Sequence, residues 1–335
     1  MNKEKRVIVP ASLTFEEHCR VNGIQKDKVL GYWHKSKYYS LKVDNKPKTE
    51  DIELIKNNLI KDLNKYSPKY NRFKYKKLKE ANLGFLSLAD LHIGKRAHNS
   101  ETGEDYNVAI AVKRALEGVD SLLSMSSVFK FDKMVLNIGN DLLHSDNSVS
   151  TTTKGTVVES DGLWSENFIK AKDLIVEIIE KMLVFAPVHC IHSMSNHDKC
   201  MGWALAIAVE SHFRLCKDVT FDNSIRDRKV FMYGKNMIGT VHMHGPKPQM
   251  INSIFASEYP VEWAAAENRY GYGHHLHHKN GTLDLPGMSF ETMRSLSGTD
   301  SYHSLHGYIG APCALEMFVH DKISQIAKFI YTVNK

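Results

Sequence analysis

Short apolar runs alternate with longer amphipathic stretches along most of the chain. The runs at 83–90, 134–139 and 188–193 have the length and composition of buried strands. The stretches at 104–124 and 163–185 place apolar residues on one stripe at helical spacing, which predicts two amphipathic helices. Strand and helix therefore alternate, and this order is typical of an α/β fold.

Strand-like runs dominate after a further helix that is predicted over 203–213. Residues 230–233 and 236–242 are apolar runs separated by Gly234-Lys235, which predicts a β-hairpin. Alternating strands and helices followed by mainly strands predict an α/β sandwich with a mixed sheet.

The N-terminal end predicts two short helices. Residues 13–20 begin with the capping-box pair Thr14 and Glu17, which predicts a helix start. Residues 25–34 carry apolar side chains at helical spacing and predict the second helix, after a turn at Asn22-Gly23. The pair matches a helix-turn-helix weakly, and two packed helices without a DNA role are the other interpretation.

A polar, lysine-rich segment follows, in which aromatic residues alternate with cations. Aromatic rings among cations can stack bases and hold phosphates, and they can equally anchor a linker onto the main domain. The residues are Tyr66, Tyr70, Phe73 and Tyr75 among Lys65, Lys69, Arg72, Lys74, Lys76 and Lys77. We therefore divide the chain into a small helical element at 1–43, a basic linker at 44–82 and a main domain at 83–335.

Positive charge is concentrated at the N-terminal end. Residues 1–82 hold 20 Lys+Arg and 10 Asp+Glu, a net charge of +10, and the rest holds 24 and 28, a net charge of −4. This asymmetry favours an anionic partner such as nucleic acid at the N-terminal end, and a solvated lysine-rich flank is the alternative interpretation.

Composition argues against a membrane or secreted protein. No apolar run approaches the roughly 20 residues that span a bilayer, and the first residues lack the apolar segment of a signal peptide. The five cysteines are odd in number and irregularly spaced, which is not typical of a disulfide framework. We expect a cytoplasmic, reduced protein with no membrane partner; the sequence leaves its oligomeric state open.

Five polar motifs each lie just beyond an apolar run, where open α/β sheets place their sites. Carboxylate and imidazole ligands together suit Mn, Fe, Zn or Ni, and two such ions about 3.5–4 Å apart can activate water and clamp a phosphate. The motifs are Asp90-Leu91-His92, Gly139-Asn140-Asp141, Asn196-His197-Asp198, His242-Met243-His244-Gly245 and Gly273-His274-His275-Leu276-His277-His278.

In this order the motifs resemble those of the calcineurin-like metallophosphoesterases, and the resemblance covers roughly residues 83–335. It implies a four-layer α/β/β/α sandwich with mixed sheets, here with a small basic N-terminal helical segment added. It also implies two divalent metal ions, with Mn²⁺ as the first choice and Fe, Zn, Ni or Mg as alternatives.

The resemblance further implies a role for each motif. Asp141 would bridge the two ions, and His197 would be the general acid, oriented by Asp198. The remaining ligands would be Asp90, His92 and His277 on the first ion and Asn196, His244 and His275 on the second.

Three positions depart from the family's pattern. Asn140 stands where the family has its bridging Asp, so that role moves to Asp141. Ser195 and His274 stand where the family usually has Gly. Residues expected to contact substrate are Asn140, Lys154, Thr156, His242 and His303.

The stretch 141–156 resembles a loop in phage- and prophage-borne members that are relatives of double-strand-break repair exonucleases. Its hydroxyls, Lys and Gly suit a phosphate or sugar backbone, and a plain surface loop is the alternative. The leading hypothesis is a metal-dependent phosphodiesterase that hydrolyses DNA. The alternatives are a phosphomonoesterase, a phosphodiesterase for small molecules or cyclic nucleotides, and a non-catalytic nucleic-acid-binding protein.

Overall fold

The protein folds as two compact units, Met1–Tyr66 and Ser67–Lys335. The computed structural model describes residues 6–10, 12–25, 29, 31–35, 40–44, 68–76, 78–277, 282–305 and 312–333. Among these residues, no helix is long and apolar enough to cross a membrane.

The small unit is a three-stranded sheet with one helix. Strand β1 (Arg6–Pro10) pairs in parallel with β2 (Gly31–Lys35), and β2 pairs antiparallel with β3 (Ser40–Asp44). Helix α1 (Phe15–Val21) begins at Thr14, where the predicted capping box with Glu17 is formed. Phe15 and Cys19 pack with Val29 as the apolar centre of this unit.

The second predicted N-terminal helix is wrong, because the chain forms β2 there. The apolar positions of 29–33 fit either period, and the adjacent aromatic residues Tyr32 and Trp33 favour a strand. Pairing on both sides settles the choice: Trp33 lies opposite Ile8 of β1 and Lys42 of β3. No helix-turn-helix is therefore formed by the described residues of this unit.

The large unit contains two mixed sheets. The six-stranded sheet has the order β14-β13-β4-β5-β6-β7, and β4 to β7 are parallel. Its strands are β4 (Asn82–Ser87), β5 (Phe131–Gly139), β6 (Val188–Ser193), β7 (Val219–Asp222), β13 (Ala314–His320) and β14 (Gln325–Thr332). The predicted strands 83–90, 134–139 and 188–193 correspond to β4, β5 and β6.

The five-stranded sheet has the order β11-β12-β10-β9-β8. Its strands are β8 (Arg228–Tyr233), β9 (Asn236–His242), β10 (Asn268–His274), β11 (Thr282–Leu285) and β12 (Met288–Thr292). The predicted hairpin is formed by β8 and β9, which pair antiparallel, whereas β9 and β10 are parallel.

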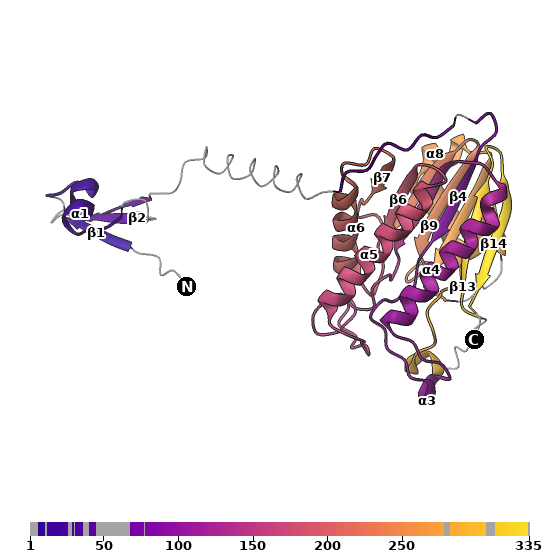
Figure 1. The fold of residues 1–335 in the computed structure, drawn as a ribbon, viewed down its shortest axis with the longest axis horizontal. Coiled ribbons are helices and arrows are strands. Elements are labelled where there is room, and N and C mark those ends of the chain that lie inside the picture. The colour runs from indigo at the N-terminus through magenta and orange to yellow at the C-terminus, as the bar shows by residue number, and fades with distance from the viewer. Residues whose placement is uncertain are drawn as a thin grey trace. The chain divides into compact units, whose positions relative to one another are not determined.

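Helices cover the outer faces of both sheets (Figure 1). Helices α4 (Val108–Met125), α5 (Trp164–Leu183) and α6 (Lys199–Phe213) cover the six-stranded sheet, and α7 (Ile251–Glu258) and α8 (Pro260–Ala265) cover the five-stranded one. The short elements are α3 (Asn99–Thr102), η2 (Ser126–Val128), η3 (Pro248–Met250) and α9 (Ser301–Leu305). The predicted four-layer sandwich is confirmed.

An apolar layer joins the two sheets. It includes Phe85 of β4, Ile238 of β9, Tyr272 of β10 and Phe318 of β13, all of which are buried. The ring centroids of Phe85 and Tyr272 lie 4.9 Å apart and the rings are stacked. These large side chains hold the two sheets face to face. The ends of β4, β5, β9 and β10 then lie at the same edge of the sandwich.

The described part of the predicted linker packs on the large unit. Tyr70 donates a hydrogen bond to Glu180 (2.7 Å), and Tyr75 donates one to the carbonyl of Leu183 (2.8 Å). These contacts lie at the C-terminal end of α5. The cations between the aromatic rings, Lys69, Arg72, Lys74 and Lys76, are exposed. For residues 68–76 the structure therefore favours the anchoring interpretation of the aromatic residues.

One buried histidine makes the stability of the large unit depend on pH. His320 ends β13, and its Nε2 lies 2.9 Å from the hydroxyl of Tyr272. Burial lowers the pKa of His320 to about 3, although the carboxylate of Asp321 opposes the shift. Because the unfolded chain takes up this proton near pH 6.5, the neutral side chain stabilises fully above that pH and progressively less as pH falls towards 3.

We predict that His320→Gln lessens the loss of unfolding free energy between pH 7 and pH 5. The contribution of one such group is at most about 1.4 kcal/mol per pH unit. Urea unfolding of the variant and the parent at both pH values measures it. His98→Gln is the matched control, because His98 is exposed. Equal pH dependence in parent and His320→Gln would contradict the prediction.

Candidate metal centre

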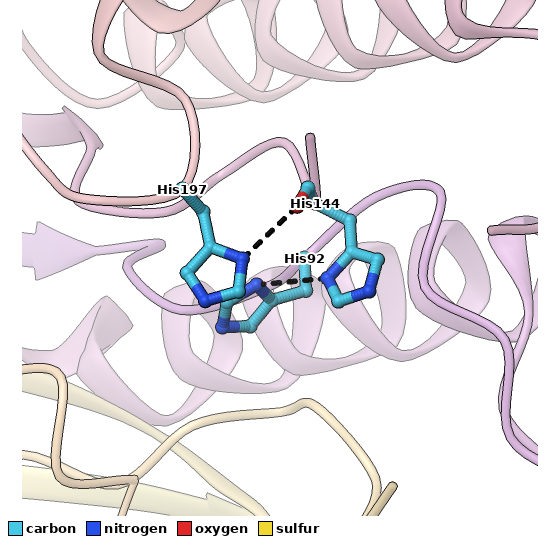
Figure 2. Close-up of side chains that lie close together, drawn as sticks. All are labelled: His92, His144 and His197. Carbon is cyan, nitrogen blue, oxygen red and sulfur yellow. Dashed lines mark hydrogen bonds between the residues drawn. The ribbon is translucent and has the colours of Figure 1, made fainter. Parts of the chain in front are cut away.

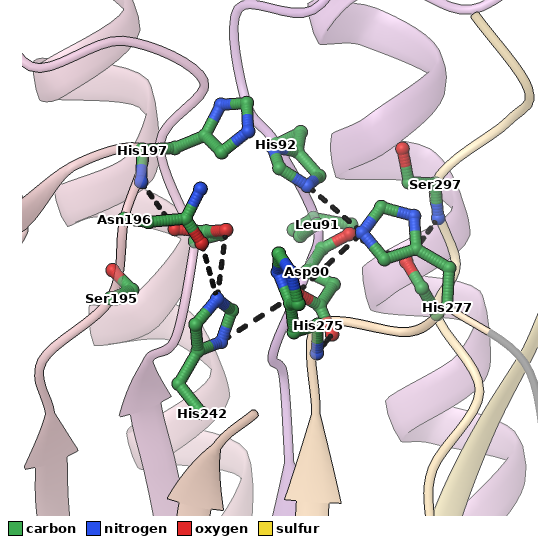
Figure 3. A network of polar contacts seen from close by, with 12 residues as sticks. Asp90, Leu91, His92, Ser195, Asn196, His197, His242, His275, His277 and Ser297 are labelled. Carbon is green, nitrogen blue, oxygen red and sulfur yellow. Dashed lines mark hydrogen bonds and ion pairs between the residues drawn. The ribbon is translucent and has the colours of Figure 1, made fainter. Parts of the chain in front are cut away.

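Described residues of all five predicted motifs meet at one edge of the sandwich, and Figure 3 labels those of every motif except the one with Asp141, which contacts His197 and His242. Asp90 follows β4, Asp141 follows β5 and Asn196 follows β6, so the parallel strands of the six-stranded sheet supply one side. His242 ends β9 and His275 follows β10, so the five-stranded sheet supplies the other side. The site therefore lies across both sheets, at the carboxyl ends of their parallel strands.

The turns that carry these residues have an unusual backbone. Seven described residues other than glycine have a positive φ, and six of them belong to these motifs. They are Asp90, His92, Asn140, Asp141, His275 and His277, with φ between 49° and 80°. Such conformations cost on the order of 1–3 kcal/mol each and cluster at functional sites, because surrounding contacts must hold them.

Backbone hydrogen bonds hold these turns together. The amide of Asp90 donates to the carbonyl of Asn140 (2.7 Å), and that of His92 donates to the carbonyl of Asp141 (3.1 Å). Gly139 has a φ of +98°, and a Cβ there would lie 2.6 Å from the ring of His192. The first two turns thus continue the pairing of β4 with β5, and only glycine fits before Asn140.

Asp90, His92 and His277 form the first group that can hold a metal ion. The Nε2 atoms of His92 and His277 lie 3.2 Å apart, and His277 Nε2 lies 3.6 Å from Asp90 Oδ1. Asp90 is fixed by its other oxygen, which accepts a hydrogen bond from the amide of His275 (2.8 Å). The sequence predicted these three residues as ligands of one ion.

Asp141, His242 and His275 form the second group. His242 Nε2 lies 3.1 Å from Asp141 Oδ2 and 2.8 Å from Asn196 Oδ1, so Asn196 adjoins this group. The two groups are adjacent, because His242 Nδ1 lies 3.9 Å from Asp90 Oδ1. The bridging role of Asp141 stays a prediction, since among the described residues its carboxylate is grouped with His242 and His275.

The structure places His242 where the sequence predicted His244. His242 is buried within the second group, whereas His244 is exposed and lies outside it. Two residues apart, they would share one face of a strand, but β9 ends at His242 and the chain bends at His244, so the two rings are placed differently. We therefore revise the predicted ligand from His244 to His242, which the sequence had suggested as a substrate contact.

The charges of the site fit a divalent cation. Burial raises the pKa of Asp90 to about 7, with the carboxylate of Asp141 adding to the shift and His242 opposing it. Asp90 Oδ1 and His242 Nδ1 are buried without a hydrogen-bond partner among the described residues, and Asp141 Oδ2 is buried against His242 Nε2 at 3.1 Å. Buried carboxylates and imidazoles left in this state are suitable ligands for Mn, Fe, Zn or Ni.

His242 and Asp141 compensate each other when no cation is bound. Although burial opposes ionisation of both groups, the Asp141 carboxylate raises the pKa of His242, and His242 keeps the pKa of Asp141 well below its usual range. A divalent cation would take the place of the proton on His242, so binding should release a proton.

His197 lies at the rim of the site and is partly buried. Its amide donates to Asp141 Oδ1 (2.8 Å), and its Nδ1 lies 3.0 Å from the carbonyl oxygen of His144. An Nδ1–H that donates to this carbonyl orients the ring and leaves Nε2 as the atom that can take up or release a proton. This geometry suits the predicted general acid.

Asp198 does not contact the ring of His197 as the sequence-based assignment required. Its carboxylate is buried, accepts a hydrogen bond from the amide of Leu143 (2.8 Å) and accepts another from the hydroxyl of Ser195. We therefore correct its role: Asp198 ties the loop after β6 to the loop after β5. The same contact gives Ser195 a function at the position where glycine was expected.

The other predicted substrate contacts have different outcomes. Asn140 is fully buried in the turn after β5, and its contact with substrate stays a prediction. Lys154 and Thr156 are exposed on a loop whose Thr153 amide donates to the carbonyl of Asn196 (3.2 Å). Their role in substrate binding stays a prediction. His303 falls within α9, and its side chain lies outside the described part of the structure.

His274 lies beneath the site rather than in it. It is buried, and its Nε2 lies 3.1 Å from Thr240 Oγ1 and 3.3 Å from both Ser87 Oγ and Asn137 Nδ2. These four polar side chains come from β10, β9, β4 and β5. They connect the central strands of the two sheets directly below the metal ligands, which accounts for a histidine at this position.

Sequence reasoning missed His144. It is buried, and its Nδ1 lies 3.3 Å from Nδ1 of His92. His92, His144 and His197 form a third group whose ring nitrogens lie close together (Figure 2). A signal was present, because His144 follows Asp141, a predicted ligand, by only three residues.

Comparison with known proteins finds only distant structural similarities. No family model matches the chain, and no curated protein matches it. Among solved structures it is similar to Vps29 from Chaetomium thermophilum, at 12% identity over 75% of this chain and 98% of that one, with a TM-score of 0.32. It is also similar to 5'-nucleotidase from Candida albicans SC5314, at 10% identity over 73% of this chain and 49% of that one, with a TM-score of 0.32.

The chain thus spans about half the length of that nucleotidase chain. Similarities this distant carry no argument about activity, so the function is inferred from the site itself.

We predict that His242→Ala binds one divalent ion fewer than the parent, whereas His244→Ala keeps the parent's stoichiometry. The reason is that only His242 lies within ligand distance of Asp141 and His275. Metal analysis after gel filtration in the presence of Mn²⁺ measures the number of ions. Loss of an ion from His244→Ala with retention by His242→Ala would restore the sequence-based assignment.

Proposed function

We propose that this protein is a metal-dependent phosphoesterase with two metal ions, and that its substrate is a phosphodiester of DNA. The observation that carries the proposal is the pair of adjacent Asp/His groups, with His197 at their rim. Asp90, His92 and His277 would hold one ion, and Asp141, Asn196, His242 and His275 the other. Such ions supply a nucleophile from water at neutral pH and compensate the charge of the phosphoryl oxygens.

The side chains of the protein have separate tasks in this reaction. The amide of His197 donates to Asp141, which couples the position of His197 to the second group. With Nδ1 held at the carbonyl of His144, Nε2 of a protonated His197 can deliver a proton to the leaving alkoxide. Asp198 keeps the loop of His197 at a fixed distance from the loop of Asp141.

We predict that Asp141→Asn loses metal and turnover together, whereas His197→Asn keeps the metal and loses turnover by about 10²–10⁴-fold. The substrate is a chromogenic phosphate bis-ester with Mn²⁺, assayed beside the corresponding mono-ester. His189→Asn is the matched control, because His189 is partly buried at the opposite end of β6. Full metal occupancy in Asp141→Asn would refute the role of Asp141. Hydrolysis of the mono-ester alone would favour a phosphomonoesterase.

The choice of DNA rests on charge and on the site's surroundings. Residues 1–66 hold 14 Lys+Arg and 9 Asp+Glu, a net charge of +5, and residues 67–82 hold 6 and 1, also +5. The cations of the second set that the structure describes, Lys69, Arg72, Lys74, Lys76 and Lys79, are exposed, and Tyr70 and Tyr75 among them contact the C-terminal end of α5. That end of the sandwich is opposite the metal ligands, which lie where the parallel strands end. The small unit is therefore the better candidate for holding DNA.

We predict that deletion of residues 1–66 weakens DNA binding and flattens its dependence on salt, because fewer phosphate contacts release fewer counterions. Cleavage of the chromogenic bis-ester should survive, since residues 68–76 stay packed on the large unit. Binding isotherms at several salt concentrations measure the effect on single- and double-stranded DNA.

The matched variant changes Lys69, Arg72, Lys74 and Lys76 to Gln, which removes four positive charges where the deletion removes a net five. This variant should bind DNA nearly as the parent does. Equal weakening in both variants would mean that net charge alone matters, and unchanged binding in the deletion would refute a DNA role for the small unit.

A further inference from the structure

The two ring nitrogens of His92 face different partners. Nε2 lies 3.2 Å from Nε2 of His277, within the first candidate metal group. Nδ1 lies 3.3 Å from Nδ1 of His144, on the other side of the ring. His92 is buried, and its ring packs against the rings of His144, His197 and His277, which limits its freedom to exchange these two contacts.

Only one arrangement of protons satisfies both contacts when Nε2 binds a metal ion. A neutral imidazole that coordinates through Nε2 carries its proton on Nδ1, and this N–H must find an acceptor. The nearest partner is Nδ1 of His144, which accepts if the proton of His144 is on its own Nε2. His144 is almost fully buried, so water does not replace it as the acceptor for Nδ1–H of His92.

We propose that His144 is a positioning residue that fixes the tautomer and the orientation of His92 for metal binding. The proposal rests on the assignment of His92 as a ligand, and it does not depend on which phosphoester is the substrate. The ring of His144 acts as the acceptor that a carboxylate or a backbone carbonyl provides behind many metal-binding histidines.

The same residue also holds the predicted general acid. The carbonyl oxygen of His144 lies 3.0 Å from Nδ1 of His197. The side chain of His144 therefore contacts a ligand of the first ion, while its backbone contacts the ring that would protonate the leaving group (Figure 2). Replacing the side chain should change the first of these contacts and leave the second in place.

Two substitutions of His144 distinguish the effect of its hydrogen bond with His92 from the effect of its packing. His144→Leu removes the acceptor and keeps an apolar side chain of similar reach. His144→Asn keeps an oxygen that can accept from Nδ1–H of His92. The matched control is His320→Leu, which alters a buried histidine at the opposite end of the sandwich.

Titration calorimetry of the metal-free protein with Mn²⁺ measures the affinity of each ion without any need for activity. His144→Leu should weaken one ion about 10–100-fold, which is the usual effect of losing such a partner, and leave the other unchanged. His144→Asn should recover most of this affinity, and His320→Leu should match the parent. Nitrogen-15 NMR should show His92 protonated at Nδ1 in the parent and no longer held in that form in His144→Leu.

Three results would overturn the proposal. Parent-like affinity for both ions in His144→Leu would show that His92 needs no such partner. Equal weakening in His144→Leu and His144→Asn would assign the effect to packing. Loss of a third ion with the other two unchanged would make His144 a metal ligand. A parent that binds no divalent ion would instead refute the proposed function, and the inference with it.

Discussion

The structure depends on placing two carboxylates, Asp90 and Asp141, side by side without access to water. Burying an ionised carboxylate is costly unless a cation or hydrogen bonds compensate it. Here the compensation is divided among the imidazole of His242, the amides of His197 and His275, and the proposed metal ions. The histidines gather around these two residues because each supplies either a proton or a ligand atom.

This constraint explains why regular secondary structure stops where it does. Strands end at Ser87 and Gly139, and Asp90, Asn140 and Asp141 beyond them adopt left-handed conformations that lie outside the range of regular β-strands. Contacts outside the turns hold this geometry: the hydroxyl of Ser295 donates to the carbonyl of Asp90, and Tyr106 donates to that of Leu91. The second layer of polar contacts is therefore as much a part of the site as the ligands.

The sequence was informative where chemistry and periodicity agree. Residues 83–90 end an apolar run with a carboxylate, and both the strand and the site were predicted from that pattern. It was misleading at 25–34, where a pattern of apolar residues fits two periods and only pairing with β1 and β3 decides. It could not distinguish His242 from His244, because β9 ends at His242 and the chain bends at His244. It did not find His144, whose placement follows from the turn with positive φ at Asn140 and Asp141.

The candidate ligands come from both sheets, three or four from each. Bound ions would therefore act as cross-links between two layers that otherwise meet through apolar side chains such as Phe85 and Tyr272 and through the polar contacts of His274. A ligand that binds only the folded state stabilises it in proportion to the logarithm of its concentration. The cellular supply of divalent ions would then set how firmly the two halves of the sandwich stay together, in addition to whether the site can react.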